Sequence, residues 1–137
     1  MKHKAKESPH FLYAIPRGKG GIEFVVGEWK ETEIHFTMLI QYQLSYAHAR
    51  EGASPDPPVA FVIHHFQELA ESKDVVLLRG EFDPDAFAAI EAHVLLTQVQ
   101  QYYGENATDA RQRLLYKFNH QPKLFTHIHV VNQLDWI

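Results

Sequence analysis

The sequence predicts an α+β fold, with a largely antiparallel sheet of about five to six strands packed with C-terminal helices. Short segments of alternating apolar residues fill the strand-rich part, residues 11–82, whereas helical spacing dominates the mainly helical part, residues 83–137. Strands that precede helices, rather than alternating with them, are typical of an antiparallel sheet. At 137 residues the chain is predicted to form a single domain, residues 1–137, with residues 1–10 as a polar lead-in.

Several segments of the first part carry strand signals. Residues 11–16 (FLYAIP) are predicted to end at Pro16, because proline has no N–H for a ladder. Residues 22–29 follow a glycine-rich turn. Residues 34–44 alternate most clearly, and the predicted strand has one face with Ile34, Phe36, Met38, Ile40 and Tyr42 and another with His35, Thr37, Gln41 and Gln43.

Two more strands are predicted after the proline-rich loop at residues 50–58. They cover residues 59–66 and 75–82. The continuous apolar run Val75–Leu78 predicts burial on both faces, and hence a central position in the sheet.

The second part contains two clear helical patterns. The first begins with Asp83 as N-cap and Pro84 at the first helical position, and it ends at Gly104. Its apolar stripe contains Phe87, Ile90, Val94, Leu95, Val99 and Tyr102. A second helix, capped by Thr108, is predicted over residues 109–118 and is broken at Pro122. The last segment, residues 123–137, is compatible with strand or helix, and we favour helix.

Composition excludes several functional classes. No cysteine is present, which excludes disulfides, thiol catalysis and thiolate metal sites. The net charge of −4 does not favour nucleic-acid binding, and the basic start MKHKAK is interpreted as a solvated terminus. No apolar run is long enough to span a membrane, and no secretory signal or transit helix is recognisable at the start.

Ten histidines raise the question of a metal site. His64 and His65 are adjacent in a predicted strand, so their side chains should point to opposite faces. His127 and His129 have a spacing that suits a metal only if their segment is a strand. Zinc needs three or four converging ligands, and no such set is visible, so we predict no metal ligands.

Signals for catalysis are equally weak. The sequence has no nucleophile elbow, Walker loop or dinucleotide fingerprint. Five acidic residues flank strand ends and a helix start: Glu68, Glu71, Glu81, Asp83 and Asp85. Capping and the helix dipole explain carboxylates near a helix N-terminus, and the spacing does not show two of them converging in a pocket. We predict no catalytic residue and no cofactor.

Six segments occur in a recognisable order and spacing: FLYAIPR, EFVVGEW, TEIHFTMLIQYQ, HFQEL…KDVVLLRGEFD, QVQQYYG and FNHQPKLF. They reach from about Phe11 to His127. Together they resemble the mitochondrial ATP synthase F₁ assembly factor 1 family. The family pattern has one histidine at His65 and none at His64, which favours a structural histidine. The chain differs from the pattern at Lys73–Asp74, where Lys-Gly is expected. The remaining matched positions are Pro16, Arg17, Glu23, Phe24, Gly27, Trp29, Thr32, Glu33, His35, Phe36, Thr37, Phe66, Glu68, Leu69, Phe118, Asn119, Pro122 and Phe125.

The resemblance implies a non-enzymatic chaperone of the mitochondrial matrix. Such a protein binds the unassembled F₁ β subunit of ATP synthase and shields the surface that later meets α. We expect a monomer whose import signal is absent from this chain. Candidate surfaces are the sheet face with Thr37 and Gln41, an exposed sheet edge, and the helix end with two tyrosines, of which at least one should escape the core. The predicted partner-binding residues are Trp29, Thr37, Gln41, Tyr102, Tyr103, Phe118, Asn119, Pro122 and Phe125.

Two alternatives stay open at this point. The fold could serve as a permanent structural subunit of a large mitochondrial complex, which stoichiometric co-purification would reveal. A histidine-based metal protein is the second alternative, and elemental analysis would test it.

Overall fold

The computed structural model describes residues 2–17, 21–43, 59–66, 77–82 and 87–134. Five strands form one antiparallel sheet in the sequential order β1-β2-β3-β4-β5. Their bounds are His10–Arg17 (β1), Gly21–Lys30 (β2), Glu33–Met38 (β3), Phe61–Phe66 (β4) and Leu77–Phe82 (β5). The predicted α+β class with an antiparallel sheet is therefore confirmed.

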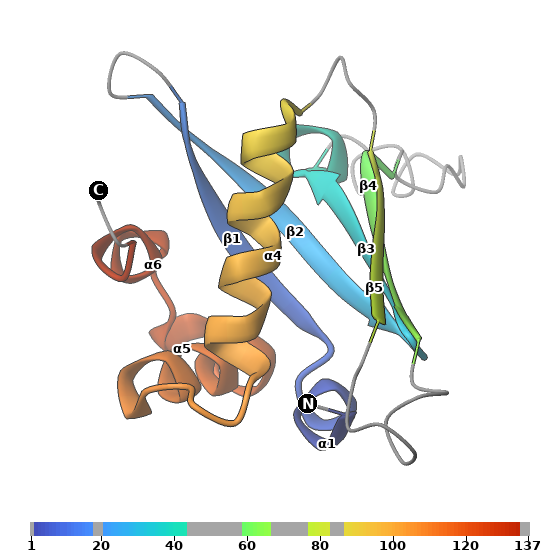
Figure 1. Ribbon diagram of the computed structural model, residues 1–137. Helices are drawn as coiled ribbons and strands as arrows, with labels where there is room; N and C mark the ends of the chain where they lie inside the picture. Colours follow the sequence, from blue (N-terminus) through green and yellow to red (C-terminus); the bar gives the residue numbers. More distant parts are fainter. Residues whose placement is uncertain (1, 18–20, 44–58, 67–76, 83–86, 135–137) are drawn as a thin grey trace, which may run out of the picture.

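The helices lie on one face of this sheet and beyond its β1 side (Figure 1). Helix α4 (Ala89–Tyr103) crosses the face, α5 (Asp109–His120) and α6 (His127–Asn132) follow on the β1 side, and α1 (Lys2–Glu7) lies where β1 begins. A 3₁₀ turn, η2 (Pro122–Leu124), connects α5 to α6. Among the described residues, no helix combines the length and apolar character needed to cross a bilayer.

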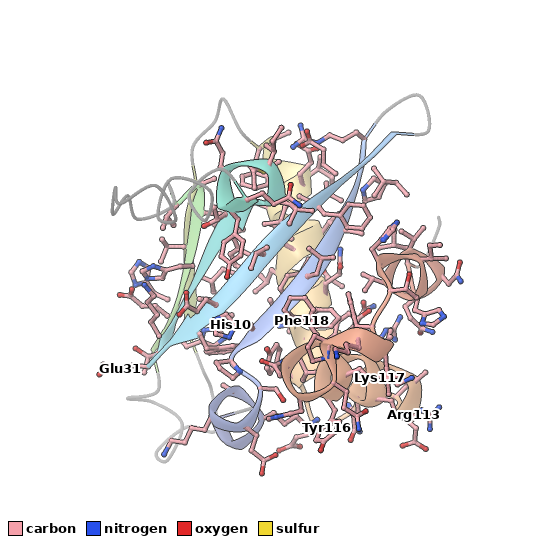
Figure 2. The ribbon with its side chains drawn as sticks, turned by 180° about the vertical axis from the view of Figure 1, so that it is seen from behind. His10, Glu31, Arg113, Tyr116, Lys117 and Phe118 are labelled. Carbon is pink, nitrogen blue, oxygen red and sulfur yellow. The ribbon has the colours of Figure 1, made fainter. Side chains whose placement is uncertain are left out.

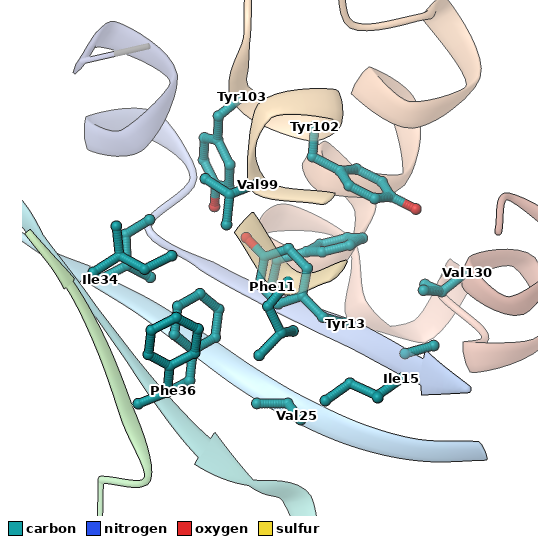
Figure 3. Packing of buried hydrophobic residues seen from close by; sticks show 14 of the residues in the cluster. Phe11, Tyr13, Ile15, Val25, Ile34, Phe36, Val99, Tyr102, Tyr103 and Val130 are labelled. Atoms are coloured by element: carbon teal, nitrogen blue, oxygen red, sulfur yellow. The ribbon is translucent and has the colours of Figure 1, made fainter. Parts of the chain in front are cut away.

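A single apolar core fills the space between the sheet and α4 (Figure 3). Strand alternation places every second side chain on this face, and the register aligns Tyr13 with Val25 and Ile34 with Ile63. Burying this apolar surface supplies the main driving force for folding. The fully buried large side chains are Tyr13, Tyr102, Tyr103, Phe11, Phe36, Phe87, Ile15, Ile34, Ile63, Leu95, Val25 and Val99.

Gly27 makes room for two of these rings. A Cβ at this position would lie 2.6 Å from the ring of Tyr13 and 3.1 Å from that of Phe36. Because the two rings pack edge to face with centroids 5.5 Å apart, neither is easily displaced. The glycine of the EFVVGEW segment is therefore a packing requirement.

Three strand predictions are wrong in detail. Strand β1 continues through Pro16 to Arg17, because β1 lies at the edge of the sheet, where a missing N–H breaks no ladder. Strand β3 ends at Met38, and residues 39–43 are helical, so Ile40 is 65% exposed. Strand β5 is the other edge of the sheet rather than its centre; Val75 and Val76 lie outside the described residues.

The helix predictions have mixed outcomes. Helix α4 begins at Ala89 with Ala88 as N-cap, so the predicted start at Pro84 is wrong; Asp83 and Pro84 themselves lie outside the described residues. The N-terminal end is closed instead by Glu91, whose carboxylate accepts a hydrogen bond from the Ala88 N–H at 2.8 Å. The predicted apolar stripe of α4 is buried toward its C-terminal end, at Leu95, Val99 and Tyr102, but Ile90 is exposed.

The ends of the later helices follow the sequence closely. Gly104 ends α4 as predicted, although its backbone is extended and a Cβ there would meet the carbonyl oxygen of Gln100. The Thr108 side chain caps α5 by accepting a hydrogen bond from the Arg111 N–H at 3.3 Å, and α5 ends before Pro122. The segment after Pro122 is helical in α6, as favoured.

The basic start of the chain is helix α1 rather than a solvated terminus. Ala5 and Ser8 are buried, and Lys4 Nζ donates a hydrogen bond to the Gly104 carbonyl oxygen at 2.8 Å. This segment therefore docks on the end of α4, about one hundred residues away in sequence.

Candidate protein-binding surface

The two neighbouring tyrosines at the end of α4 are both buried, so the prediction that one of them escapes the core is wrong. Tyr102 packs on Phe11 with ring centroids 4.3 Å apart. The Tyr103 hydroxyl donates a 2.6 Å hydrogen bond to the Ser8 carbonyl oxygen. Burial raises the pKa of both phenols, that of Tyr102 to about 12. These side chains hold the fold together, and the folded chain does not present them to a partner.

The late FNHQPKLF segment fixes α5 and η2 to the edge of β1. Asn119 Oδ1 accepts a 3.0 Å hydrogen bond from the His10 N–H, and Asn119 Nδ2 donates to the His10 carbonyl oxygen at 2.6 Å. One side-chain amide therefore pairs with both outward backbone groups of His10, as a neighbouring strand would. Phe118 and Phe125 are half-buried, with ring centroids 5.0 Å apart, and Pro122 begins η2 at the surface.

The remaining strand candidates are divided between the two faces of the sheet. Trp29 lies on the α4 face, half-buried, with its ring 4.9 Å from that of His65 and 5.4 Å from that of Tyr103. Thr37 lies on the opposite face and is only 5% exposed. Gln41 is exposed but belongs to the helical residues 39–43, so the predicted strand face that joins it to Thr37 does not form.

The adjacent histidines point to opposite faces, as predicted. His65 is buried on the α4 face, and burial lowers its pKa. His64 faces the other way, with its Nδ1 3.1 Å from Glu33 Oε1. His127 and His129 are exposed on α6, where a helix directs residues two apart to different sides.

No group of three or more potential ligands within the described ranges is arranged to hold a metal ion. Four of the acidic residues considered for a carboxylate pair lie outside those ranges: Glu68, Glu71, Asp83 and Asp85.

A row of titratable side chains crosses the sheet on the face opposite α4. We call it the histidine–glutamate strip, and it contains His10, Glu28, Glu33, His35 and His64. Glu33 Oε2 lies 2.8 Å from His35 Nε2, and Glu28 Oε1 lies 3.5 Å from His10 Nε2. The hydrogen bond with His35, together with the charge of His64, lowers the pKa of Glu33. Each carboxylate of the strip already has a histidine partner on this chain.

A groove lies between α1 and α5, with a volume of about 410 Å³. Leu115 contributes apolar floor, whereas Tyr116 stands at the rim and is 54% exposed. Figure 2 shows Arg113, Tyr116 and Lys117 together on α5. We call this region the α1–α5 surface, and its lining residues are Lys4, Glu7, Ser8, Gln112, Arg113, Leu115, Tyr116, Lys117 and Gln121.

A smaller groove of about 190 Å³ lies on the other side of α5, against α6. Arg113 and Lys117 line both grooves, so they form a ridge between two hollows. Residues four apart on a helix lie one above the other, which explains why these two cations share the ridge.

The α1 side of this surface is held by contacts that are distant in sequence. The Tyr103 hydroxyl and the Lys4 ammonium tie α1 and the residue after it to the end of α4. Ser8 Oγ lies 3.5 Å from His120 Nε2 at the end of α5. The groove is therefore a product of the tertiary fold.

Sequence reasoning missed Arg113, Tyr116 and Lys117. Their exposure could have been predicted, because they lie away from the apolar side of α5, which Leu114 and Leu115 occupy. Tyrosine and arginine are residue types enriched in protein interfaces, and the exposed Tyr116 lies on the same helix as Arg113. The next two residues of α5, by contrast, form contacts within the fold: Phe118 packs against Phe125, and Asn119 pairs with the His10 backbone.

Comparison with known proteins identifies the family. The sequence model of the family described as ATP11 protein matches residues 1–131. The chain belongs to the ATP11 family. It is 36% identical over 132 residues to ATP synthase mitochondrial F1 complex assembly factor 1 of Danio rerio, covering 96% of this chain and 40% of the relative.

Two further relatives extend this similarity. The protein of the same name from Homo sapiens is 36% identical over 135 residues, covering 97% of this chain and 38% of the relative. Protein atp11, mitochondrial, of Schizosaccharomyces pombe is 27% identical over 121 residues, covering 83% of this chain and 40% of the relative. The chain spans about two fifths of the length of these curated relatives. The family resemblance seen in the sequence is confirmed.

Proposed function

We propose that this protein is a non-catalytic assembly factor for the F₁ part of mitochondrial ATP synthase. The observation that carries the proposal is the family match over residues 1–131, together with relatives named as F1 complex assembly factors. Its partner is the unassembled β subunit, whose α-facing surface it shields until α binds. The same relatives support a mitochondrial location, and we propose the matrix as the compartment.

The physical task explains why no reaction is required. A subunit that waits for its partner exposes an apolar interface, and such a surface aggregates. A protein that covers it must release it again, so an interface of about 1,200–2,000 Å² with moderate affinity suits the role. Partner binding through the remaining predicted residues stays a prediction: Trp29, Thr37, Gln41, Phe118, Asn119, Pro122 and Phe125.

Size-exclusion chromatography with isolated, nucleotide-free F₁ β subunit tests the proposal. We expect co-elution of the protein with β at micromolar concentration, and release when α is added. A folded protein that does not bind β contradicts the proposal. Stoichiometric retention in the mature complex would instead identify a structural subunit.

A further inference from the structure

We propose that the α1–α5 surface is the docking site for an acidic segment of the F₁ partner. In this arrangement Arg113 and Lys117 face carboxylates of the partner, and Tyr116 packs against its backbone or apolar side chains. The inference rests on the proposed function, because it names the chemistry by which the same partner is recognised.

The first argument is the distribution of charge. Helices α1 and α5 contain six of the 13 Lys and Arg residues of the chain but two of the 17 Asp and Glu residues. They therefore carry a net charge of +4, whereas the rest of the chain carries −8, giving the total of −4. A positive surface on a negative protein attracts and orients an acidic partner.

The second argument is that the cations on α5 are not used by the fold. Arg17 forms ion pairs with Glu23 and Glu91, each at 2.9 Å. Arg111 donates a hydrogen bond to the Gln133 carbonyl oxygen at 2.9 Å. Arg113 and Lys117, in contrast, form no side-chain hydrogen bond or ion pair with any described residue. Their charge is available to another molecule.

The third argument is the shape of the site. A groove of about 410 Å³ has room for a few side chains, within the range of about 300–1,000 Å³ typical of binding pockets. Its floor at Leu115 is apolar, and its rim carries a tyrosine and an arginine, which are residue types enriched where interfaces gain most of their affinity. The combination fits a peptide segment with carboxylates that flank an apolar residue.

A nucleic acid is a less suitable occupant. A nucleic acid is a long polyanion, and the chain outside α1 and α5 has a net charge of −8, which disfavours binding it. A short acidic protein segment requires only the local positive charge. This distinction enters the test as a separate outcome.

The test compares two double variants in binding to isolated F₁ β subunit. Arg113→Glu with Lys117→Glu reverses the charge of the ridge. The matched control, Lys30→Glu with Lys123→Glu, makes the same change of net charge at exposed lysines outside the groove. Both variants should keep the wild-type melting temperature within about 2 °C, because the changes are at surface positions. A third variant, Tyr116→Ala, probes the aromatic contact.

We expect the ridge variant to bind β about tenfold or more weakly, with a flatter dependence of affinity on salt, and the control to bind within about threefold of wild type. Equal binding by the ridge variant and the control overturns the docking site but leaves the proposed function standing. No binding by the wild type overturns both. Unchanged β binding combined with loss of binding to a fluorescent oligonucleotide would overturn the docking site in favour of a nucleic-acid surface.

Discussion

The α1–α5 surface and the histidine–glutamate strip are both polar regions, but they hold their charges in different ways. The cations of the first are lysine and arginine, and Arg113 and Lys117 have no carboxylate partner among the described residues. In the histidine–glutamate strip each carboxylate is paired with a histidine, and Glu33 contacts both His35 and His64. One region offers uncompensated charge to another molecule, whereas the other balances its charge internally.

The difference teaches that surface charge alone does not identify a binding site. The strip has more titratable groups in close contact, and histidine is the side chain that titrates between pH 5 and 8. Its interactions are nevertheless already satisfied on the same sheet. His10 connects the two regions, because its ring belongs to the strip while its backbone is held by Asn119 of α5.

The largest expected effect comes from cutting this connection with Asn119→Ala. The variant loses both hydrogen bonds to His10 and the 2.9 Å bond from Nδ2 to the Leu115 carbonyl oxygen. It leaves backbone groups without partners, so the free energy of unfolding should fall by about 2–3 kcal/mol in urea denaturation. Asn132→Ala, at an exposed asparagine of α6, is the control. An equal effect of the two changes would contradict the role of Asn119.

A smaller effect is expected from Tyr103→Phe, which loosens α1 without touching the strip. The change removes the hydroxyl that donates to the Ser8 carbonyl oxygen, so the free energy of unfolding should fall by about 1–2 kcal/mol. Hydrogen exchange should become faster in α1 and stay unchanged in β3 and β4. Unchanged exchange in α1 would show that Lys4 and the core hold this helix without the tyrosine.

The strip should be the region that responds to acid. Because the pKa of Glu33 is lowered below its ordinary 4.5, its contribution to stability is complete above that pH and is lost as the pH falls through the lowered value. Glu33→Gln should therefore flatten the decrease in the free energy of unfolding below pH 4.5. Urea titrations from neutral to acidic pH measure the slope. Glu105→Gln, which changes an exposed carboxylate outside the strip, should leave the slope as in wild type.

The smallest effect concerns the turn between β2 and β3, next to the strip. Glu31 has a φ of 59°, a left-handed conformation that is costly for a residue with a Cβ. Glu31→Gly should raise the free energy of unfolding by about 0.5–1 kcal/mol. Lys30→Gly, with the same loss of side chain in an extended position, should lower it. Destabilisation by Glu31→Gly would mean that its carboxylate contributes more than the backbone conformation costs.

Local patterns in the sequence were sufficient for part of this fold. The alternation at Ile34, Phe36 and Met38 predicts the face that packs on the core, because side chains of a strand alternate between faces. Ile34 and Phe36 are fully buried there, and Met38 is partly buried. Thr108 and Pro122 mark the ends of α5 through local backbone chemistry.

The features that local sequence patterns do not predict depend on contacts between segments that are distant in sequence. Tyr102 and Tyr103 are both buried, because the sheet covers one ring and the segment around Ser8 covers the other. The role of Asn119 requires His10, 109 residues away. The groove likewise requires α1, which gave no recognisable helix signal, to dock on the end of α4 and so lie beside α5.

The covering of β1 has a consequence for the order of events during folding. At this edge Asn119 pairs with both backbone groups of His10, and Gln98 donates a 2.7 Å hydrogen bond to the Ala14 carbonyl oxygen. Each strand of the sheet pairs with the one before it, so residues 10–82 contain all five strands, whereas the side chains that cover β1 belong to α4 and α5. A chain whose sheet forms before these helices dock presents an uncovered strand edge. The protein that we propose as a guard of incomplete assemblies therefore passes through an exposed state of its own.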